Sequence, residues 1–483
     1  MGLSTWLLML VAHPLDFRTL VQYRIYHNTA HDITSPEEHV SSGWDRPSMR
    51  RCWELQDMTS RSFSAVVKEL DGDLSRVVCL FYLVLRALDT VEDDMTLPAD
   101  VKQPLLRNFH THTLTPGFAF TGSGPNESDR QLLVEYPVVV EELLRLTERN
   151  RAVIVNICEK MGAGMADFAL RADAALASNS AFGLETAEEY DLYCHYVAGL
   201  VGEGLSLLFA ASGKEPPGLA AQLELSNSMG LFLQKTNIPR DVAEDVAERR
   251  YMWPRELWGP QGARYGGGFP SMEDLCAAPV SALSTEPRAL FVLSAMVLDA
   301  LRHAPDTLDY LRLLKDASIF RFCAIPAVMA IATLELCFMN PAVLQRNVKI
   351  RRAQAARLIM RSTNARTVGL LFRDYARKIH ARALPSDPNF MRISVACGKI
   401  EQWCEHNYPS FVRLPRGARA PAIDVTDARG RTFFAYEAHG GRAPAQGPTN
   451  IWGVGASELL TYMVVGVVLV GLVMQLTGAA AAL

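Results

Sequence analysis

The feature that most constrains this fold is a three- and four-residue spacing of apolar side chains along almost the whole chain. Two long examples are SFSAVVKELDGDLSRVVCLFYLVLRALDTVED at residues 62–93 and YCHYVAGLVGEGLSLLFAAS at residues 193–212. This spacing places apolar side chains on one face of a helix. Alternating strand patterns are hard to find, and there is no internal repeat. The sequence therefore predicts an all-α helical bundle.

Charge and cysteine content narrow the class of protein. The chain carries 48 Lys and Arg against 52 Asp and Glu, a formal net charge of -4. A nucleic-acid-binding domain usually needs a basic face, so we expect no nucleic acid partner. The nine cysteines are scattered and form no CxxC pair. They are therefore expected to be buried free thiols in a reducing compartment.

The two ends of the chain differ. The N-terminus, MGLSTWLLML, is apolar but lacks a basic n-region and a cleavage site, so an amphipathic first helix is expected. Residues 459–483 contain no charged side chain and are long enough to cross a bilayer. They predict a tail anchor, with the rest of the protein facing the cytosol.

Three stretches rich in Gly, Pro and small polar residues read as loops, at 110–130, 259–271 and 413–450. The last is a flexible linker with few candidates for a core. We therefore expect a helical catalytic domain at 1–412, a linker at 413–450 and a membrane anchor at 451–483. The catalytic domain is expected to be monomeric.

Acidic and basic side chains share one face of an otherwise apolar helix in FYLVLRALDTVEDDM, residues 81–95. Tyr82, Arg86, Asp89 and Asp93 are spaced i, i+4, i+7, i+11, and Glu92 lies beside them. Stacked carboxylates repel one another, so a buried cluster needs a cation. Taken alone, however, an acidic pair at this spacing is more often a solvated helix face.

A second stripe changes that balance. The segment LFLQKTNIPRDVAEDVAERRYMWP, residues 231–254, repeats the pattern through Gln234, Asn237, Asp241 and Asp245, flanked by Arg240 and Glu244. Two polar stripes on apolar helices suggest one shared cavity. Oxygen ligands favour Mg²⁺, which commonly bridges carboxylates to substrate phosphates. A diphosphate between the stripes would explain both, with the remaining oxygen charge taken up by Arg61, Arg86, Arg240 and Arg250.

Five segments in order resemble the squalene and phytoene synthase family. They are TSRSF (59–63), FYLVLRALDTVEDDM (81–95), YCHYVAGLVG (193–202), LQKTNIPRDVAED (233–245) and FCAIPAVMAIATLEL (322–336). The resemblance covers roughly residues 16–412. It implies the class I isoprenoid synthase fold, a helical bundle around a central cavity. The C-terminal transmembrane helix also fits this family.

The resemblance implies a two-step reaction on two farnesyl diphosphates. A 1'-1 condensation gives presqualene diphosphate, and a rearrangement with hydride from NADPH gives squalene, the first committed step of sterol biosynthesis. Mg²⁺ and NADPH would be the cofactors. The implied location is the endoplasmic reticulum membrane.

Residue roles follow from the two stripes and the resemblance together. The magnesium ligands would be Asp89, Glu92, Asp93, Asp241, Glu244 and Asp245. The diphosphate site would comprise Ser60, Arg61, Phe63, Arg86, Gln234, Asn237, Arg240 and Arg250. The catalytic group would comprise Tyr82, Arg86, Tyr193, Phe322 and Cys323, with aromatic rings stabilising carbocations.

No GxGxxG fingerprint follows a predicted strand, so the sequence contains no recognisable nicotinamide-binding motif. The glycines at 162 and 164 lie in a helical run, where they are expected to serve packing. The candidate is the basic run NVKIRRAQAARL, residues 347–358. Lys349, Arg351 and Arg352 could bind the 2′-phosphate of NADPH, and the resemblance places Asn347 and Lys349 in a segment associated with the cofactor. Taken alone, such a run is more often a solvated helix start.

Three residues depart from the family pattern. Ser128 stands where the family usually has a lysine, Pro239 lies inside the second stripe, and Met252 replaces an aromatic residue. These changes leave two rivals open. One is an enzyme of the same fold that stops at presqualene diphosphate or at a dehydrosqualene or phytoene-type product. The other is a tail-anchored helical scaffold that has lost catalysis.

Overall fold

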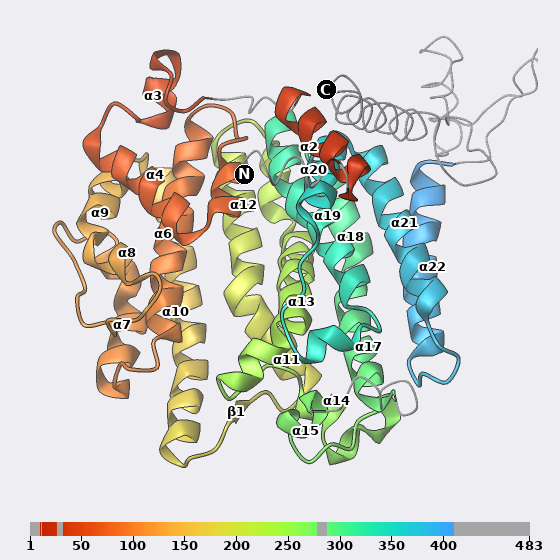
Figure 1. Ribbon diagram of the computed structural model, residues 1–483. Coiled ribbons are helices and arrows are strands. Elements are labelled where there is room, and N and C mark those ends of the chain that lie inside the picture. Colours follow the sequence, from red (N-terminus) through yellow and green to blue (C-terminus); the bar gives the residue numbers. More distant parts are fainter. Residues whose placement is uncertain (1–9, 11, 27–31, 278–286, 410–483) are drawn as a thin grey trace, which may run out of the picture. The chain divides into compact units, whose positions relative to one another are not determined.

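Helices form nearly all of the regular structure in the computed structural model, which describes residues 10, 12–26, 32–277 and 287–409 (Figure 1). This confirms the predicted all-α class. The chain divides into two units: one contains 1–28, 350–361 and 402–483, and the other contains 29–349 and 362–401. The predicted anchor and linker lie outside the described residues, so the predicted domain boundaries stay predictions.

The larger unit holds most of the helices. Its α-helices are α3 (His39–Ser42), α4 (Pro47–Thr59), α5 (Arg61–Val67), α6 (Asp73–Asp93), α7 (Ala99–His112), α8 (Arg130–Val134), α9 (Tyr136–Leu144), α10 (Glu148–Ala177), α11 (Ala187–Cys194), α12 (Leu200–Ala211), α13 (Leu223–Ala247), α14 (Arg255–Trp258), α15 (Met272–Cys276), α17 (Arg288–Leu301), α18 (Ala304–Leu313), α19 (Ala317–Cys337) and α21 (Ala365–Arg382). Short 3-10 turns are η1 (Pro36–Glu38), η3 (Pro217–Ala221), η4 (Pro260–Tyr265) and η5 (Pro341–Leu344). A π-helical turn, η2 (His195–Gly199), joins α11 to α12.

In the smaller unit, α2 (Pro14–Tyr26) packs against α20 (Arg352–Arg361). An ion pair between Arg351 and Asp16, 3.2 Å apart, joins the two segments. Helix α22 (Phe390–Asn407) begins in the larger unit and ends in the smaller one.

The core of the larger unit is built around α13, which packs against α12, α17, α18 and α19 (Figure 1). Helix α13 continues through Pro239 without interruption. The stretches 187–211 and 317–337 are each long and apolar enough to cross a membrane. Most of the apolar window in 317–337 is buried within the bundle, so we assign this stretch to the protein core.

Glycines allow α13 to lie very close to the segment after Tyr193. A Cβ at Gly199 would come within 2.0 Å of Asn227 Oδ1, and one at Gly230 would come within 2.3 Å of the Ala198 carbonyl oxygen. These approaches exclude any larger side chain. The glycine at 162 has the packing role predicted from sequence, because a Cβ there would meet the Leu106 carbonyl oxygen at 2.4 Å.

Two features add to the sequence predictions. The first is a short parallel pair of strands, β1 (Phe182–Gly183) and β2 (Arg250–Tyr251), in which Phe182 is opposite Arg250. This pairing fixes the backbone from which Arg250 extends. The second concerns the cysteines: all nine are free, and all but the half-buried Cys276 are buried, as predicted.

Candidate active site

The first acidic stripe lies on α6 as the spacing predicted. From Val77 to Asp94 every residue is buried except a half-buried set on one face, and that set consists of Tyr82, Arg86, Asp89, Glu92 and Asp93. The apolar remainder of α6 packs into the core. Burial of the other faces therefore directs the polar stripe into the interior of the bundle rather than into bulk solvent.

The second stripe lies on α13. Gln234, Asn237, Arg240, Asp241 and Asp245 are half-buried, and Glu244 is exposed. Arg240 forms a two-pronged ion pair with the neighbouring Asp241, with nitrogen–oxygen distances of 2.7 and 2.5 Å. Part of the acid charge on this stripe is therefore already compensated by its own helix.

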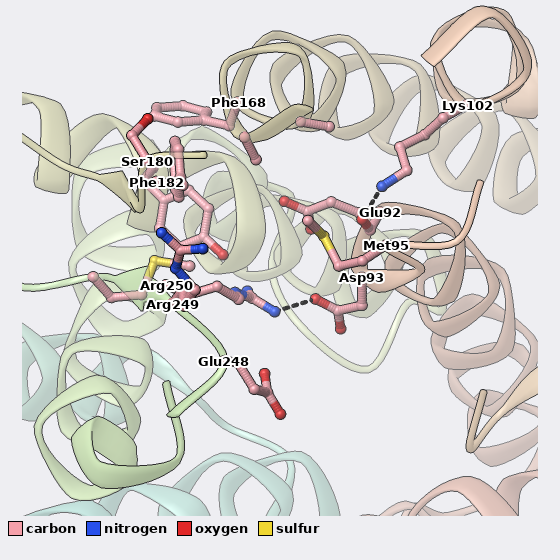
Figure 2. A pocket seen from close by; sticks show the side chains of 14 residues that line it. Glu92, Asp93, Met95, Lys102, Phe168, Ser180, Phe182, Glu248, Arg249 and Arg250 are labelled. Carbon is pink, nitrogen blue, oxygen red and sulfur yellow. Dashed lines mark hydrogen bonds and ion pairs between the residues drawn. The ribbon is translucent and has the colours of Figure 1, made fainter. Parts of the chain in front are cut away.

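Arg250 connects the two stripes. Its Nη1 donates to Asp93 Oδ1 at 2.8 Å (Figure 2). Burial opposes the charge on this guanidinium, but Tyr193, Asp93, Glu92 and Asp245 outweigh it and raise the pKa of Arg250. Because these groups come from α6, α11 and α13, the two stripes face one electrostatic site.

Asp89 and Asp245 are carboxylates whose charge is poorly compensated. Burial raises the pKa of Asp89 to about 7; Arg86 opposes this shift, and Asp93 and Asp129 add to it. Burial also raises the pKa of Asp245 to about 7, against the opposing charge of Arg250.

Glu92 belongs with these two acids. Burial, with Asp93 beside it, raises the pKa of Glu92 as well. Each stripe thus presents carboxyl groups that favour an added cation.

Arg86 is held by a residue that sequence reasoning missed. Its guanidinium contacts Asp129 at 2.5–2.6 Å, whereas its nearest approach to Asp89 is 3.8 Å. Asp129 directly follows Ser128, which is exposed. The loop that lacks the family's lysine therefore supplies a carboxylate to the first stripe.

Tyr193 lines a small cavity of about 80 Å³ together with Glu92 and Asp93 of the first stripe. The side chain is buried, and its ring packs edge-on against Phe168 with centroids 5.2 Å apart. Burial raises the pKa of Tyr193, with Glu92 adding to the effect and Arg250 opposing it. The same cavity is lined by Lys102, whose ammonium donates to the Glu92 carbonyl oxygen at 3.1 Å.

The predicted aromatic residues converge. The ring of Phe63 lies 5.1 Å from that of Tyr82 and 5.8 Å from that of Phe322. Phe209 extends the cluster, 5.9 Å from Phe322. Cys323 is buried next to Phe322, and burial raises the pKa of its thiol, which keeps it protonated.

The TSRSF segment begins α5. The Ser60 hydroxyl accepts a hydrogen bond from the Phe63 amide at 3.4 Å and so caps this helix. Arg61 is the first residue of α5, and its side chain lies outside the described residues.

The three predicted cofactor residues occupy different surroundings. Asn347 donates through Nδ2 to Asp241 Oδ1 at 2.5 Å and to Glu244 Oε2 at 3.2 Å, so it adjoins the second stripe. Its Oδ1 is buried without a hydrogen-bond partner among the described residues. Lys349 is exposed. Arg351 belongs to the smaller unit, where it pairs with Asp16.

Within the described part of the chain, no three His, Cys, Asp or Glu side chains come together in an arrangement that could hold a metal by themselves. The predicted magnesium ligands thus form no such group; their oxygen donors are of the type used by a metal that takes its remaining ligands from substrate and water. Mg²⁺ behaves in this way.

The sequence analysis missed three charged residues with buried contacts: Lys102, Asp129 and Lys235. The last is fully buried between Asp191 and Asp299, on the face of α13 away from the acids. Lys235 could have been suspected from the sequence, because a lysine next to an apolar stretch of a core helix needs a buried partner. Lys102 and Asp129 lie in polar segments, where a functional side chain has no distinctive pattern.

Comparisons with known proteins agree with this geometry. A family model described as squalene/phytoene synthase matches residues 57–354. A squalene synthase of Ganoderma lucidum is 57% identical over 443 residues, 91% of this chain and 93% of that one. One of Mycosarcoma maydis is 52% identical over 437 residues, 88% of this chain and 74% of that one.

A solved complex of TcSQS with the ligand BPH1237 has a TM-score of 0.67 at 40% identity, covering 74% of this chain and 99% of that one. Sequence and structure thus lead to the same relatives. The chain belongs to the squalene/phytoene synthase family.

Proposed function

We propose that this protein joins two molecules of farnesyl diphosphate to presqualene diphosphate and then reduces that intermediate to squalene. The observation that carries the proposal is the pair of carboxylate stripes on α6 and α13 that face one site through Arg250. Family membership supports the same reaction. The product would commit isoprenoid carbon to sterols.

Mg²⁺ would be held by Asp89, Glu92 and Asp93 on one side and by Asp241, Glu244 and Asp245 on the other, completed by diphosphate oxygens and water. The fit rests on the raised pKa values of Asp89 and Asp245, which report buried negative charge short of a partner. When bound, the metal would neutralise charge on the leaving diphosphate.

The chain's own residues would carry the rest of the first step. Arg86, Arg240 and Arg250 would bind diphosphate oxygens, exchanging their present carboxylate partners for the substrate. Gln234 and Asn237 would orient the head group from the same stripe. Ser60 and Arg61 would contribute from the start of α5.

Tyr193 suits the movement of a proton or the support of the departing diphosphate. Burial keeps its hydroxyl protonated and ready to donate, and it lies within the electrostatic reach of Glu92 and Arg250. A phenol in that position would act at the boundary between the acid site and the hydrocarbon pocket.

The second step needs a dry, electron-rich pocket. The rings of Phe63, Tyr82 and Phe322 line one continuous cluster that would exclude water and stabilise a carbocation. Cys323 is buried beside them. NADPH, when bound, would supply the hydride, and Asn347, Lys349 and Arg351 would hold it.

We also infer that residues 459–483 anchor the protein in the endoplasmic reticulum membrane, with the catalytic domain in the cytosol. The support is the absence of charge over this stretch and its spanning length. Deleting the stretch should release the protein from membranes; an equally membrane-bound truncated form would contradict the inference.

Product analysis tests the proposed reaction. The purified enzyme should convert farnesyl diphosphate to squalene only with both Mg²⁺ and NADPH, and should accumulate presqualene diphosphate when NADPH is withheld. Squalene formed without a reductant would refute the mechanism. Presqualene diphosphate under both conditions would identify an enzyme that stops early, and no turnover by folded protein would identify a scaffold.

A further inference from the structure

A groove of about 550 Å³ lies away from the acid stripes in the larger unit. One wall carries Leu298 from the last turn of α17 and Arg302, the residue that follows this helix, and another is the face of α22 that carries Val395 and Lys399. Both pairs are four residues apart, so each wall combines an apolar and a cationic side chain. Ligand pockets commonly occupy about 300–1,000 Å³.

Asn389, in the groove lining, has an acceptor with no donor. Its Nδ2 donates to the Phe291 carbonyl oxygen and to Asp387 Oδ1, both at 3.0 Å. These two acceptors fix the amide orientation, because a flipped amide would place Oδ1 against two oxygens. Oδ1 is buried without a hydrogen-bond partner among the described residues. The side chain is 1% exposed, and a buried acceptor without a hydrogen bond is energetically unfavourable.

Tyr190 presents a second unsatisfied group in the same lining. Its ring is 1% exposed and lies 4.8 Å from the buried Lys235 ammonium. The hydroxyl lacks an ordinary hydrogen bond within the described residues. The Tyr190 hydroxyl contacts the Cys194 thiol and acts to lower the pKa of that thiol. Burial has the larger effect and raises this pKa. A thiol is a weak partner, so the hydroxyl stays available to a ligand.

Several charged side chains along the groove are compensated by neighbouring groups. Arg302 pairs with Asp191 and Asp299, which also hold Lys235, so these four side chains neutralise one another. Glu256 accepts from the Ala187 amide at the first turn of α11, which stabilises its charge.

Beyond these, the groove lining holds two further cations on α22, Arg392 and Lys399. The Arg392 guanidinium lies 5.5 Å from the centre of the Tyr265 ring, and both α22 cations are exposed.

We propose that this groove is a second binding site for an amphiphile with a phosphorylated head and a single apolar chain. Arg392 and Lys399 bind the head, while Asn389 and Tyr190 bond to polar atoms within the groove. Leu298 and Val395 cover the chain. A free phosphate would leave the apolar walls wet, and a two-chain phospholipid exceeds the groove volume. Prenyl diphosphates and lysophospholipids share this chemistry.

Counting bound ligand tests the proposal with full-length protein in zwitterionic nanodiscs. The probe is labelled farnesyl thiodiphosphate, a non-ionising analogue, in equilibrium dialysis with Mg²⁺. Val395→Trp fills the groove from a position that is 54% exposed, so folding should be unaffected. Wild type should bind one more molecule per chain than this variant. Equal numbers would overturn the proposal.

A charge variant supplies the second arm. Arg392→Gln with Lys399→Gln should weaken the additional site by about 10-fold or more, since both charged contacts to the head group are lost. The matched controls are Val40→Trp, on exposed α3, and Lys315→Gln, an exposed cation outside the groove lining. Both should bind as wild type; a loss in the controls equal to that in the groove variants would overturn the assignment.

Competition identifies the source of the ligand. Lysophosphatidic acid that displaces only the additional molecule would indicate a membrane lipid, and failure to displace it would indicate a prenyl diphosphate. Both outcomes support the class. Inorganic pyrophosphate that competes as strongly as the chain-bearing compounds would contradict it. Because the comparison is between binding counts, it stands even if squalene formation fails.

Discussion

The two acid stripes share a spacing but differ in how their charge is compensated. On α6, the second acid is paired: Asp93 receives Arg250 from β2, a segment far away in sequence. On α13, the first acid is paired: Asp241 receives Arg240 from the adjacent position, and Asn347 as well. Among the remaining acids, the pKa values of Asp89 and Asp245 are raised to about 7, and that of Glu92 is raised as well.

The two stripes are therefore not equivalent, although their residues have the same spacing. The first stripe depends on a tertiary contact, whereas the second is organised mostly by its own helix and one side chain from the segment before α20. Each stripe nevertheless keeps one carboxylate short of a cation. We therefore expect both stripes to be needed for chemistry, but their supporting residues to differ in importance.

The largest effect should come from the carboxylates themselves. Asp89→Asn and Asp241→Asn should each slow presqualene diphosphate formation by about 10³-fold, because stabilisation of the leaving group is lost. Single-turnover kinetics with labelled farnesyl diphosphate measures this. Asp100→Asn, an exposed acid on α7, is the control. A wild-type rate in either variant would remove that stripe from the site.

The arginines should separate the stripes. Arg250→Gln should lower the first-step rate by about 10²-fold, the usual effect of losing one donor to developing negative charge. Arg240→Gln should lower it less, since two hydrogen bonds hold Arg240 to Asp241, whereas one holds Arg250 to Asp93. Parallel rate measurements on both variants test the order. Equal losses would show that the tertiary contact to Asp93 has no special role.

Asn347 tests whether the second stripe is shared with the cofactor segment. Because its amide holds Asp241 and Glu244, Asn347→Ala should slow the first step by about 10-fold, as loss of a group that orients metal ligands does. Lys349→Ala should instead raise the KM for NADPH and leave the first step unchanged. If Asn347→Ala alters only the NADPH step, the residue serves the cofactor and not the acids.

The smallest effect on the first-step rate is expected from His303, which contacts Ser228 on the face of α13 away from the acids. Arg302 donates to His303 Nε2 at 3.2 Å, which leaves Nδ1 to donate to Ser228 Oγ at 2.7 Å. Burial, with Lys235 and Arg302, lowers the pKa of His303 to about 3. The unfolded chain therefore binds a proton below about pH 6.5 that the folded protein does not, and stability falls as pH falls from 6.5 toward 3.

His303→Gln removes this difference. The loss of free energy of unfolding between pH 6.5 and 5 should become shallower in denaturant titrations, while the first-step rate stays as in wild type. A steeper pH dependence would contradict the pKa direction. A slower first step would show that the far face of α13 influences the acid stripe.

The fold was largely predictable because it depends on periodicity. The burial of α6 follows its apolar spacing, and Tyr82, Arg86 and Asp89 lie on the predicted shared face. The convergence of Phe63 with Phe322 followed from the family resemblance and not from spacing, because these residues are far apart in the chain.

The tertiary partners could not be predicted. The pairing of Arg86 with Asp129 depends on how the loop after α7 folds back, and no local pattern encodes that path. The contact of Asn347 with Asp241 likewise joins segments more than a hundred residues apart. The buried Lys235 required knowledge of two carboxylates on other helices. Such contacts are set by packing, not by sequence spacing.

Metal binding tests the central claim, one diphosphate site shared by two stripes, most directly. Electron paramagnetic resonance of Mn²⁺, used in place of Mg²⁺, can count tightly bound metal with and without farnesyl thiodiphosphate. Wild type should bind metal tightly only with the analogue, and Asp89→Asn and Asp245→Asn should each lose that binding. Analogue-dependent metal binding that survives intact in either variant would contradict the shared site.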